Sequence, residues 1–479
     1  MPSQIIGRNE EKGMLKKLLQ SKQPELVAIY GRRRVGKTYL IKTFFEKDIV
    51  FSCTGQHHGN TEHQLYNFSE RLKLFFPRLR NQVQLTSWQE AFVRLREGLQ
   101  TIKRKGKKVV FIDELPWLES HKSGFLSSFS YFWNEYAAEM KDIIIIICGS
   151  AASWIIDKVI NDKGGLHNRI TKRIRLLPFT LYETEQYLLY KKIKYSYYDL
   201  LQLYMIIGGI PAYLNEVQRG KSIAQNVESI CFSKDGILAG EFDNLYAALF
   251  NASDRHIQVV QALAKKSKGL TRQEILEATK LITGGALSKV LHELTESGFV
   301  DKFYPFGKKE KDSLYRLTDE FSLFYFRFMQ GKRSAEKNQW LLKQASPVFT
   351  TWSGYAFESV CMKHIQQIKG ALQIGAVQTN ISSWVFAGNK YDKGAQVDVL
   401  IDRADNVINI CEMKFSTTEF KIDKRYCGEL QHKKEVFKKQ SGTRKTMALT
   451  LITTYGVHDN AYKEQLVDAE LKMEDLFKP

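Results

Sequence analysis

The sequence predicts a multidomain α/β protein whose first part is a parallel sheet covered by helices. Three observations lead to this prediction. The chain has 479 residues, which is too many for one ordinary hydrophobic core. Short apolar runs alternate with helical stretches between residues 25 and 178, as in a parallel sheet whose strands are joined by helices. One apolar run leads directly into a glycine-rich motif of the kind that binds phosphate.

The strands of the predicted sheet are short, and their apolar runs are nearly continuous. A run such as Ile143 to Ile147 is typical of a central strand that is buried on both faces. No run approaches the ~20 residues of a membrane-spanning helix, so we expect no membrane insertion. The five predicted strands are Glu25 to Tyr30, Ile49 to Cys53, Lys108 to Ile112, Asp142 to Cys148 and Arg173 to Leu177.

The phosphate-binding motif lies between the first strand and a predicted helix from Tyr39 to Phe45. Its glycines let the backbone curl so that successive N–H groups face an anion, and the helix N-terminus adds its positive dipole. We expect Lys37 to contact the β and γ phosphates of ATP and Thr38 to give its hydroxyl to Mg²⁺. The predicted nucleotide-binding residues are Gly31, Arg32, Arg33, Arg34, Val35, Gly36, Lys37, Thr38 and Tyr39.

An acidic motif predicts that the bound ATP is hydrolysed. Val109 to Glu114 is an apolar strand that ends in two acids. We expect Asp113 beside the Mg²⁺ ion and Glu114 where it can orient or deprotonate the attacking water. The two motifs together predict a P-loop ATPase core over residues 1–180.

Residues 181–248 lose the strand signal and take up helical spacing. Their apolar positions, such as Tyr187, Leu188 and Leu200, form the kind of stripe that usually packs into a core. We predict a helical lid here and no ligand site.

Residues 249–320 contain three short helical patterns and then two strands separated by Gly307-Lys308-Lys309. In the third helical pattern, apolar residues at i, i+3, i+4 and i+7 form one buried stripe and leave polar residues outward. This order of elements predicts a winged helix-turn-helix. The stripe is Leu287, Val290, Leu291 and Leu294, and the outward residues are Ser288, Lys289 and His292.

Positive charge on the predicted third helix and wing suits contact with DNA phosphates. Acidic neighbours, Glu293, Glu296 and Glu310, dilute this charge, so an interdomain or protein contact stays open. The residues expected to carry the positive charge are Lys289, His292, Lys308, Lys309 and Lys311.

After a helical connector at residues 321–345, residues 346–479 mix helix and hairpin signals. Two strands, joined by a polar turn from Arg403 to Asn406, carry a group of charged residues. Period-two geometry sends Glu412 and Lys414 to one face, and the hairpin can bring Asp398 to that same face. Such carboxylates can bind Mg²⁺, while the lysine positions a water and stabilises negative charge in a phosphoryl transition state.

Composition and charge limit the classes of partner. A formal net charge of +19 favours a polyanion, with nucleic acid first and an anionic membrane surface second, although a generally basic proteome would give the same charge. The six cysteines form no C-x-x-C pair, which fits a reducing cytoplasm and predicts neither a zinc site nor a disulfide framework. The N-terminal segment lacks a basic region followed by an apolar run, so we expect no export.

The first part of the chain resembles archaeal-type AAA-like ATPases, which are related to the signal-transduction ATPases with numerous domains. Ile6-Gly7-Arg8-Asn9-Glu10 resembles their N-terminal box, which implies that Arg8 lies at the nucleotide. Cys148-Gly149-Ser150 is similar to their sensor strand end, with Ser150 as the polar sensor. Gly208-Gly209-Ile210-Pro211 resembles the lid motif near the base, which implies roles for Gly209 and Pro211. Arg169 matches the place of an arginine that contacts the γ-phosphate, in its own subunit or a neighbour's, although its Leu166-His167-Asn168 context departs from the aromatic-Gly-Arg expected there.

The last part resembles the PD-(D/E)xK nuclease superfamily, which implies an α/β restriction-endonuclease-like domain over residues 346–479. The resemblance rests on the spacing of Asp398, Glu412 and Lys414. Glu358, in Gly354-Tyr-Ala-Phe-Glu358, resembles the first-helix glutamate of that fold and would join Asp398 and Glu412 as a metal ligand. Lys433 or Lys434 falls on the helix after the hairpin. Domains of this kind are known mainly as domains of unknown function.

These observations predict an ATP-hydrolysing protein that acts on DNA through a Mg²⁺-dependent nuclease domain. In this interpretation, hydrolysis at Lys37, Asp113 and Glu114 controls access of DNA to the C-terminal carboxylates. One alternative is a nucleotide-driven switch, in defence or mobile-element biology, whose C-terminal domain only binds nucleic acid or a partner. A second alternative is an ATPase with purely protein partners, including further copies of itself.

Overall fold

The computed structural model describes residues 4–82, 84–120, 122–161, 164–250, 253–266, 268–280, 284–331, 338–390 and 393–479. The chain divides into two compact units, Met1–Pro178 and Phe179–Pro479. None of the helices in these described ranges combines the length and the apolar character that crossing a bilayer requires. The six cysteines, all among the described residues, are buried and unpaired.

The first unit is built on a five-stranded, all-parallel sheet in the order β2-β3-β4-β1-β5. All five predicted strands are confirmed, each within two residues of its predicted ends. The two central strands with the most continuous apolar runs, β3 and β4, are buried along their whole length. The bounds are β1 (Glu25–Tyr30), β2 (Ile49–Thr54), β3 (Lys108–Asp113), β4 (Ile143–Gly149) and β5 (Lys172–Arg175).

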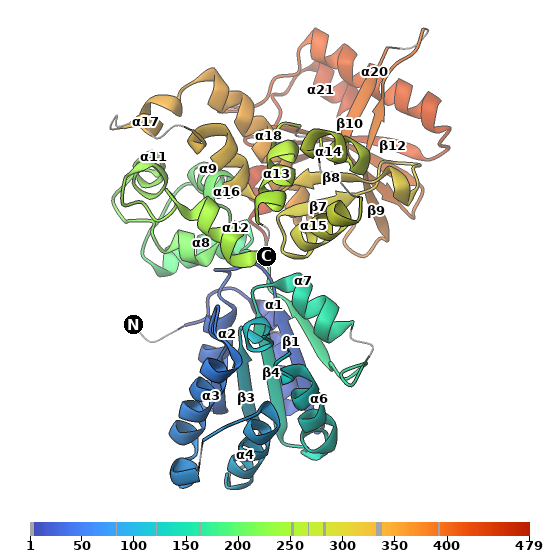
Figure 1. Ribbon diagram of the computed structural model, residues 1–479. Helices are drawn as coiled ribbons and strands as arrows, with labels where there is room; N and C mark the ends of the chain where they lie inside the picture. Colours follow the sequence, from blue (N-terminus) through green and yellow to red (C-terminus); the bar gives the residue numbers. More distant parts are fainter. Residues whose placement is uncertain are drawn as a thin grey trace. The chain divides into compact units, whose positions relative to one another are not determined.

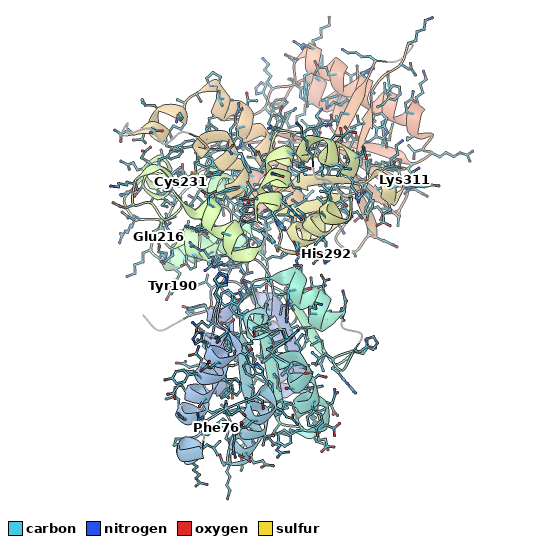
Figure 2. All side chains as sticks on the ribbon, in the orientation of Figure 1. Phe76, Tyr190, Glu216, Cys231, His292 and Lys311 are labelled. Carbon is cyan, nitrogen blue, oxygen red and sulfur yellow. The ribbon has the colours of Figure 1, made fainter. Side chains whose placement is uncertain are left out.

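Helices cover both faces of this sheet (Figure 1). One face carries an aromatic core, in which Phe76, labelled in Figure 2, stacks on Phe51 with 6.0 Å between ring centroids. Burial of such rings contributes about 1.5–3 kcal/mol each. The helices of this unit are α1 (Asn9–Gln20), α2 (Lys37–Phe44), α3 (Thr61–Phe75), α4 (Trp88–Gln100), α5 (Leu115–Leu118), α6 (Phe125–Glu135) and α7 (Ala152–Ile155).

The second unit begins with helices alone, which confirms the helical character predicted for residues 181–248. Its longest helix here, α9, is mostly apolar, and its second half from Leu203 to Ile207 is completely buried. The first two residues of α9 contact the C-terminal part of the chain. The ring centroids of Tyr197 and Phe477 are 4.5 Å apart, and Tyr198 stacks on Phe415 and Tyr455. These helices are α8 (Leu181–Tyr190), α9 (Tyr197–Ile207), α10 (Pro211–Leu214), α11 (Ile223–Val227) and α12 (Glu241–Leu249).

Three helices and a small antiparallel sheet in the order β6-β8-β7 follow. The predicted stripe on the third helix is confirmed, since its four apolar members are buried and the three predicted outward residues are exposed. The elements are α13 (Ser253–Ala264), β6 (Leu270–Thr271), α14 (Arg272–Thr279), α15 (Gly284–Glu296), β7 (Val300–Phe303) and β8 (Leu314–Leu317).

The rest of the chain forms a separate five-stranded mixed sheet in the order β13-β12-β11-β10-β9. The predicted hairpin is confirmed as β10 and β11, which pair antiparallel. Part of the predicted connector, residues 332–337, lies outside the described residues. The strands are β9 (Thr379–Phe386), β10 (Ala395–Arg403), β11 (Val407–Lys414), β12 (Thr446–Thr453) and β13 (Ala469–Lys472). The helices are α16 (Glu320–Phe324), the π-helical turn η6 (Tyr325–Met329), α17 (Gln339–Lys343), α18 (Pro347–Lys363), α19 (Ile365–Ala371), α20 (Lys424–Ser441), α21 (Ala461–Leu466) and α22 (Met473–Leu476).

A buried histidine joins α18 to α8 within the second unit. The first residue of α8, Leu181, donates its backbone N–H to Nε2 of His364 at 2.9 Å, and Nδ1 of His364 donates to the carbonyl oxygen of Val360 at 2.8 Å. Both bonds require the neutral ring, since Nε2 has to accept. Burial lowers the pKa of His364 from 6.5 to about 4.

The neutral form of His364 makes the stability of the protein depend on pH. Between pH 4 and pH 6.5 the unfolded chain binds a proton at His364 that the folded chain does not. Stability from this group is therefore complete above pH 6.5 and falls by on the order of 3 kcal/mol as the pH drops to 4. We expect His364→Gln, which cannot ionise, to flatten the pH dependence of unfolding in urea over this window. Equal slopes in the two proteins would contradict this role.

Candidate functional site

The phosphate loop lies between β1 and α2, at the carboxyl edge of the parallel sheet. Gly31 has a φ of 141°, and a Cβ at this position would lie 2.3 Å from the carbonyl oxygen of Leu176, so only glycine fits. Gly36 has a φ of 92° and caps α2, which begins at Lys37 rather than at the predicted Tyr39. The loop can therefore turn sharply and present its N–H groups to an anion.

The side chain of Lys37 is buried and curls back over the loop. Its Nζ donates to the carbonyl oxygens of Gly31 at 2.8 Å and Arg32 at 2.9 Å. These bonds hold the ammonium group above the turn, where the terminal phosphates of a nucleotide would lie. The position of Lys37 therefore suits the predicted phosphate contact.

Thr38 and Asp113 meet directly, as the two motifs predict for ligands of one ion. The hydroxyl of Thr38 donates to Oδ2 of Asp113 at 2.7 Å, and Asp113 is almost completely buried. A hydroxyl and a carboxylate are hard oxygen donors, which Mg²⁺ prefers together with waters and nucleotide phosphates. The residues present thus fit a nucleotide-bound Mg²⁺.

Glu114 is held in place by Ser150. Oε2 of Glu114 accepts from the backbone N–H of Ser150 at 3.0 Å and from its hydroxyl at 2.9 Å. The backbone at Glu114 has a φ of 44°, a left-handed conformation that is uncommon outside glycine and is concentrated at functional sites. Both residues are predicted from the sequence as members of the site, but the contact between them is not.

His57 is a further residue near this site that the sequence did not indicate. Burial and the neighbouring His58 and Arg33 lower the pKa of His57, whereas Glu114 raises it. The ring of His57 also lies 4.9 Å from the Trp117 ring. His57 therefore lies within electrostatic reach of the hydrolysis residues.

Arg8 is buried at the base of the phosphate loop. Its guanidinium donates to the carbonyl oxygens of Val35 at 3.2 Å and Leu177 at 2.7 Å. Arg8 thus ties the N-terminal segment to the loop and to the end of the first unit. Nucleotide contact by Arg8 stays a prediction.

The remaining predicted nucleotide residues of the first unit differ in exposure. Arg32 is buried, Arg33 and Arg34 are half-buried, and the Tyr39 hydroxyl donates to the carbonyl oxygen of Gln4 at 3.2 Å. Arg169 is exposed in the turn before β5, and it makes no hydrogen bond or ion pair with the described residues of the phosphate loop. Its role at the γ-phosphate stays a prediction.

The predicted lid motif lies in the second unit, where close contact between two backbone segments explains its glycine. A Cβ at Gly209 would lie 2.0 Å from the carbonyl oxygen of Phe179, so two backbone segments touch there. Phe179 donates its N–H to the carbonyl oxygen of Gly209 at 2.7 Å. Pro211 is the first residue of α10, a position that suits proline.

A second candidate site lies on the C-terminal sheet, where Asp398 falls on an irregularity of β10. Val397 pairs with Trp384, but Leu400 pairs with Ser382, so two residues of β10 oppose one of β9. Such a β-bulge redirects a side chain and is common beside active sites. The register of β10 with β11 places Asp398 opposite Glu412.

Glu412 is buried and fully engaged in this structure. Its Oε1 accepts from Nζ of Lys433 at 2.6 Å, and its Oε2 accepts from the hydroxyl of Tyr426 at 3.2 Å. Burial and the Glu412 carboxylate raise the pKa of Tyr426, so Tyr426 stays a donor. Of the two lysines predicted on the following helix, Lys433 is the one at Glu412, while Lys434 pairs with Asp468 at 3.7 Å.

Glu358 and Lys414 belong to the same group of charges. Burial raises the pKa of Glu358 to about 7, the Asp398 carboxylate adds to this rise, and Arg316 and Lys414 oppose it. Oε2 of Glu358 lies 3.9 Å from a guanidinium nitrogen of Arg316, which belongs to β8. The four predicted residues therefore lie within electrostatic reach of one another.

The donor set restricts which metal this group could hold. Among the described residues, no three acidic, histidine or cysteine side chains lie close enough together to ligate one ion. Mg²⁺ typically takes one or two carboxylates and completes its shell with waters and substrate phosphate. Asp398 and Glu412 on neighbouring strands suit that arrangement, provided that Lys433 gives up its place at Glu412.

The positive residues predicted to contact DNA lie on α15 and between β7 and β8. One of them, Lys289, lies 4.0 Å from Glu293, which also accepts a hydrogen bond from His256 at 2.7 Å. Lys302 of β7 pairs with Glu310 at 2.9 Å. Figure 2 labels His292 and Lys311 of this group.

Comparison with known proteins agrees with the geometry of the first site. Residues 6–217 match a family described as an ATPase domain predominantly from Archaea, and residues 325–426 match one described as archaeal and bacterial proteins of unknown function. An uncharacterized protein of Methanocaldococcus jannaschii is 24% identical over 400 residues, which are 81% of this chain and 83% of that protein. An uncharacterized ATP-binding protein of the same archaeon is 46% identical over 42 residues, 9% of this chain and 71% of that protein.

A solved structure of a Walker-type ATPase of Pyrococcus abyssi is similar in fold, with a TM-score of 0.51 and 19% identity. The similarity covers 67% of this chain and 96% of that chain. With the family match and the loop geometry, this similarity identifies a P-loop ATPase domain in the chain, followed by a separate C-terminal sheet domain.

Proposed function

We propose that this P-loop ATPase acts on DNA and that ATP hydrolysis controls a Mg²⁺-dependent nuclease site on the C-terminal sheet. The observation that carries the proposal is the grouping of Glu358, Asp398, Glu412 and Lys414, with Asp398 on a β-bulge opposite Glu412. These residues come from one helix and two paired strands, as the resemblance to PD-(D/E)xK nucleases implies.

In the ATPase domain, we assign each residue the role that its contacts allow. Lys37 neutralises the terminal phosphates, Thr38 and Asp113 hold Mg²⁺, and Glu114 orients or deprotonates the attacking water. Ser150 fixes the carboxylate of Glu114 through two hydrogen bonds. We propose Arg8, Gly209 and Pro211 as further nucleotide residues and Arg169 as the arginine that reaches the γ-phosphate.

At the nuclease site, Asp398 and Glu412 would hold Mg²⁺. Glu358, the third ligand that the resemblance implies, does not lie close enough in this structure to ligate the same ion. The ion would supply a Lewis acid for the scissile phosphate and a more acidic bound water. Lys414, whose Nζ lies 5.0 Å from the centre of the Tyr426 ring, would stabilise negative charge on the phosphate during attack. The hydroxyl of Tyr426 would continue to position Glu412, while Lys433 would leave Oε1 of Glu412 to the ion.

We propose that residues 249–320 act as a winged helix that contacts the DNA backbone. The exposed third helix and the lysines between β7 and β8 support this role, and the net charge of +19 favours a polyanionic partner. Because charge near phosphates gives no sequence preference, this contact would position DNA rather than select it.

A cleavage assay with the full chain tests the proposal. Supercoiled, linear, branched and single-stranded DNA are each incubated with the protein, Mg²⁺ and ATP, and products are resolved on gels. We expect nicks or cuts in at least one substrate and none without Mg²⁺. Protein that hydrolyses ATP while leaving all four substrates intact would refute the nuclease.

A nucleotide-driven switch without nuclease action is the second candidate, and one observation favours it. Both Glu412 and Glu358 already lie beside cations of the chain itself, Lys433 and Arg316. In this alternative, the C-terminal domain only binds nucleic acid or a protein partner, including another copy of the chain. It predicts ATP turnover with every DNA substrate intact.

Binding of ATP at the phosphate loop predicts a measurable stabilisation. A ligand present at a hundred times its dissociation constant stabilises the folded state by about 2.7 kcal/mol. We expect ATP to raise the melting temperature of the wild-type chain and to leave Lys37→Ala unshifted, because the variant loses the phosphate contact. Lys42→Ala, an exposed lysine of the same helix, is the matched control and should shift like wild type. An equal shift in Lys37→Ala would rule out this loop as the ATP site.

A further inference from the structure

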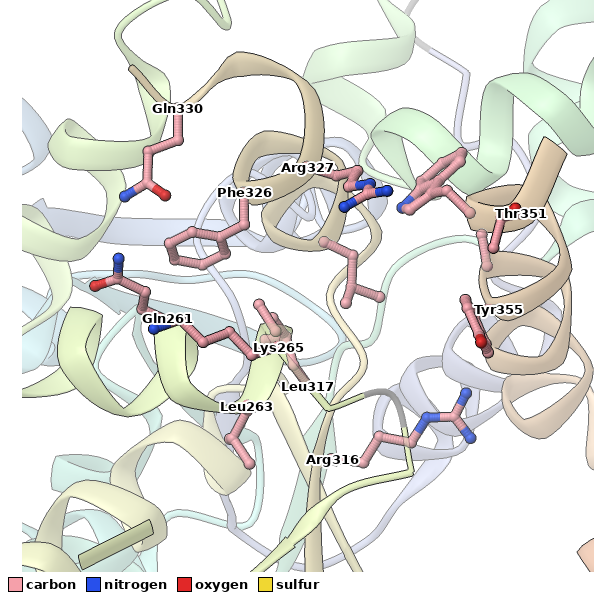
Figure 3. Close-up of a pocket in the computed structure, with 14 residues that line it drawn as sticks. Gln261, Leu263, Lys265, Arg316, Leu317, Phe326, Arg327, Gln330, Thr351 and Tyr355 are labelled. Carbon is pink, nitrogen blue, oxygen red and sulfur yellow. The ribbon is translucent and has the colours of Figure 1, made fainter. Parts of the chain in front are cut away.

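A cationic groove that adjoins the C-terminal candidate site lies in the second unit. It has a volume of about 480 Å³ and runs between the end of α13, strand β8, the turn η6 and α18 (Figure 3). Lys265, Arg316 and Arg327 line it, and no acidic side chain is among its described lining residues. The groove therefore suits an anionic ligand.

The groove also offers aromatic and amide surfaces. In Figure 3, Gln261 and Gln330 face each other on one side, Thr351 and Tyr355 lie on the other, and Phe326 and Arg327 lie between them. Tyr355 is 46% exposed, so its ring is accessible to a ligand in the groove.

The floor of the groove is a well-packed aromatic side chain. Trp352 lines it and is buried in an aromatic cluster, with its ring 5.6 Å from Phe324 and 5.4 Å from Phe328. An accessible aromatic ring beside cations is the arrangement by which single-stranded nucleic acids are held, with bases on aromatic faces and phosphates on Lys and Arg.

The groove leads to the carboxylate group of the C-terminal sheet. Thr351, Tyr355 and Glu358 are spaced i, i+4 and i+7 on α18, so they share one face of that helix. Arg316 lines the groove and also lies 3.9 Å from Glu358. One face of α18 thus connects the groove to the carboxylates of the proposed nuclease site.

We propose that this groove binds single-stranded nucleic acid and directs the strand toward Glu358 and Asp398. Phosphates would lie on Lys265 and Arg327, and a base would stack on Tyr355. A strand segment fits better than a small free nucleotide, because several lining residues are exposed, whereas small-ligand sites bury about 70–90% of their ligand. The choice of nucleic acid over other polyanions rests on the proposed action on DNA.

Fluorescence anisotropy of the full chain tests the groove separately from cleavage. The probe is a fluorescein-labelled oligothymidine of about 16 nucleotides, within the common range of single-strand sites, titrated in EDTA so that no metal-dependent step contributes. Salt is varied from about 50 to 200 mM. A duplex of equal length and a poly-glutamate peptide are the competing ligands.

We expect Tyr355→Ala to weaken oligothymidine binding roughly 5- to 150-fold, while Tyr355→Phe, which keeps the ring, binds like wild type. The pair Lys265→Ala and Arg327→Ala should lower the slope of log affinity against log salt by about 1.4. The control pair, Lys266→Ala and Arg425→Ala, removes equal charge from residues that pair with Glu274 and Glu429, and it should leave the slope unchanged. Circular dichroism and melting curves check that each variant is folded.

Two outcomes would contradict the proposal that the groove binds single-stranded nucleic acid. One is unchanged oligothymidine affinity and salt slope in the folded groove variants. The other is duplex or poly-glutamate binding that is as tight as that of oligothymidine and equally lost in the variants. If the protein left DNA intact in the presence of Mg²⁺, the nuclease proposal would fail. Binding of oligothymidine to the groove in EDTA would still be expected.

Discussion

Replacing Glu114 by Gln is expected to lower the rate of ATP hydrolysis by about 10²- to 10⁴-fold, the usual contribution of a general base. The carboxylate of Glu114 accepts two hydrogen bonds from Ser150, and an amide oxygen can keep both of them while losing the ability to take a proton. The turnover number should therefore fall with the fold and the ATP affinity preserved. Phosphate release and an ATP binding titration measure the two quantities.

Two further variants sharpen this test. Glu97→Gln changes a surface glutamate of the same unit that pairs with Arg94, and its turnover should equal that of wild type. Ser150→Ala removes one of the two donors to Glu114 and keeps the backbone N–H, so we expect a smaller loss than in Glu114→Gln. Wild-type turnover in Glu114→Gln would mean that another group activates the water.

The second large effect is expected at the C-terminal site. Asp398→Asn, Glu412→Gln and Lys414→Ala should each reduce Mg²⁺-dependent DNA cleavage at least about 10²-fold, because each removes charge from the transition state or from its metal. ATP turnover should continue at the wild-type rate. The rate of plasmid nicking and phosphate release in the same reaction measure both activities.

A carboxylate on the same strand provides the control for this series. Asp402 pairs with Lys445 at 2.6 Å, and Asp402→Asn should cleave like wild type. Glu412→Gln is preferred to Glu412→Ala because it keeps the side-chain volume and one oxygen that can still accept from Lys433 or from Tyr426. Cleavage that survives in all three site variants would point to a contaminating nuclease or to another site.

The elements predicted most accurately from the sequence are those with strong local patterns. The five parallel strands and the stripe on α15 follow from apolar periodicity, and the phosphate loop follows from glycines whose positions the backbone requires. The hairpin of β10 and β11 was also predictable, since alternation and a polar turn flank it. These features can be predicted because a helix or strand buries residues at regular intervals, which leaves a periodic apolar pattern in the sequence.

The sequence could not predict contacts that depend on packing between distant elements. Arg316 meets Glu358 across 42 positions, and no pattern links β8 with α18 before both are folded. No glycine near Asp398 marks the position of the β-bulge in the sequence. Tyr426 and Lys433, seven residues apart on α20, share a helix face, yet only the placement of α20 on the sheet turns that face toward Glu412.

The aromatic contacts of α9 bear on how such a chain can evolve. Tyr198 stacks on Phe415, the residue directly after Lys414, and Tyr197 lies against Phe477 near the end of the chain. A lineage that exchanged the C-terminal sheet for another domain would leave these rings without these partners, so such an exchange would expose aromatic surface on α9.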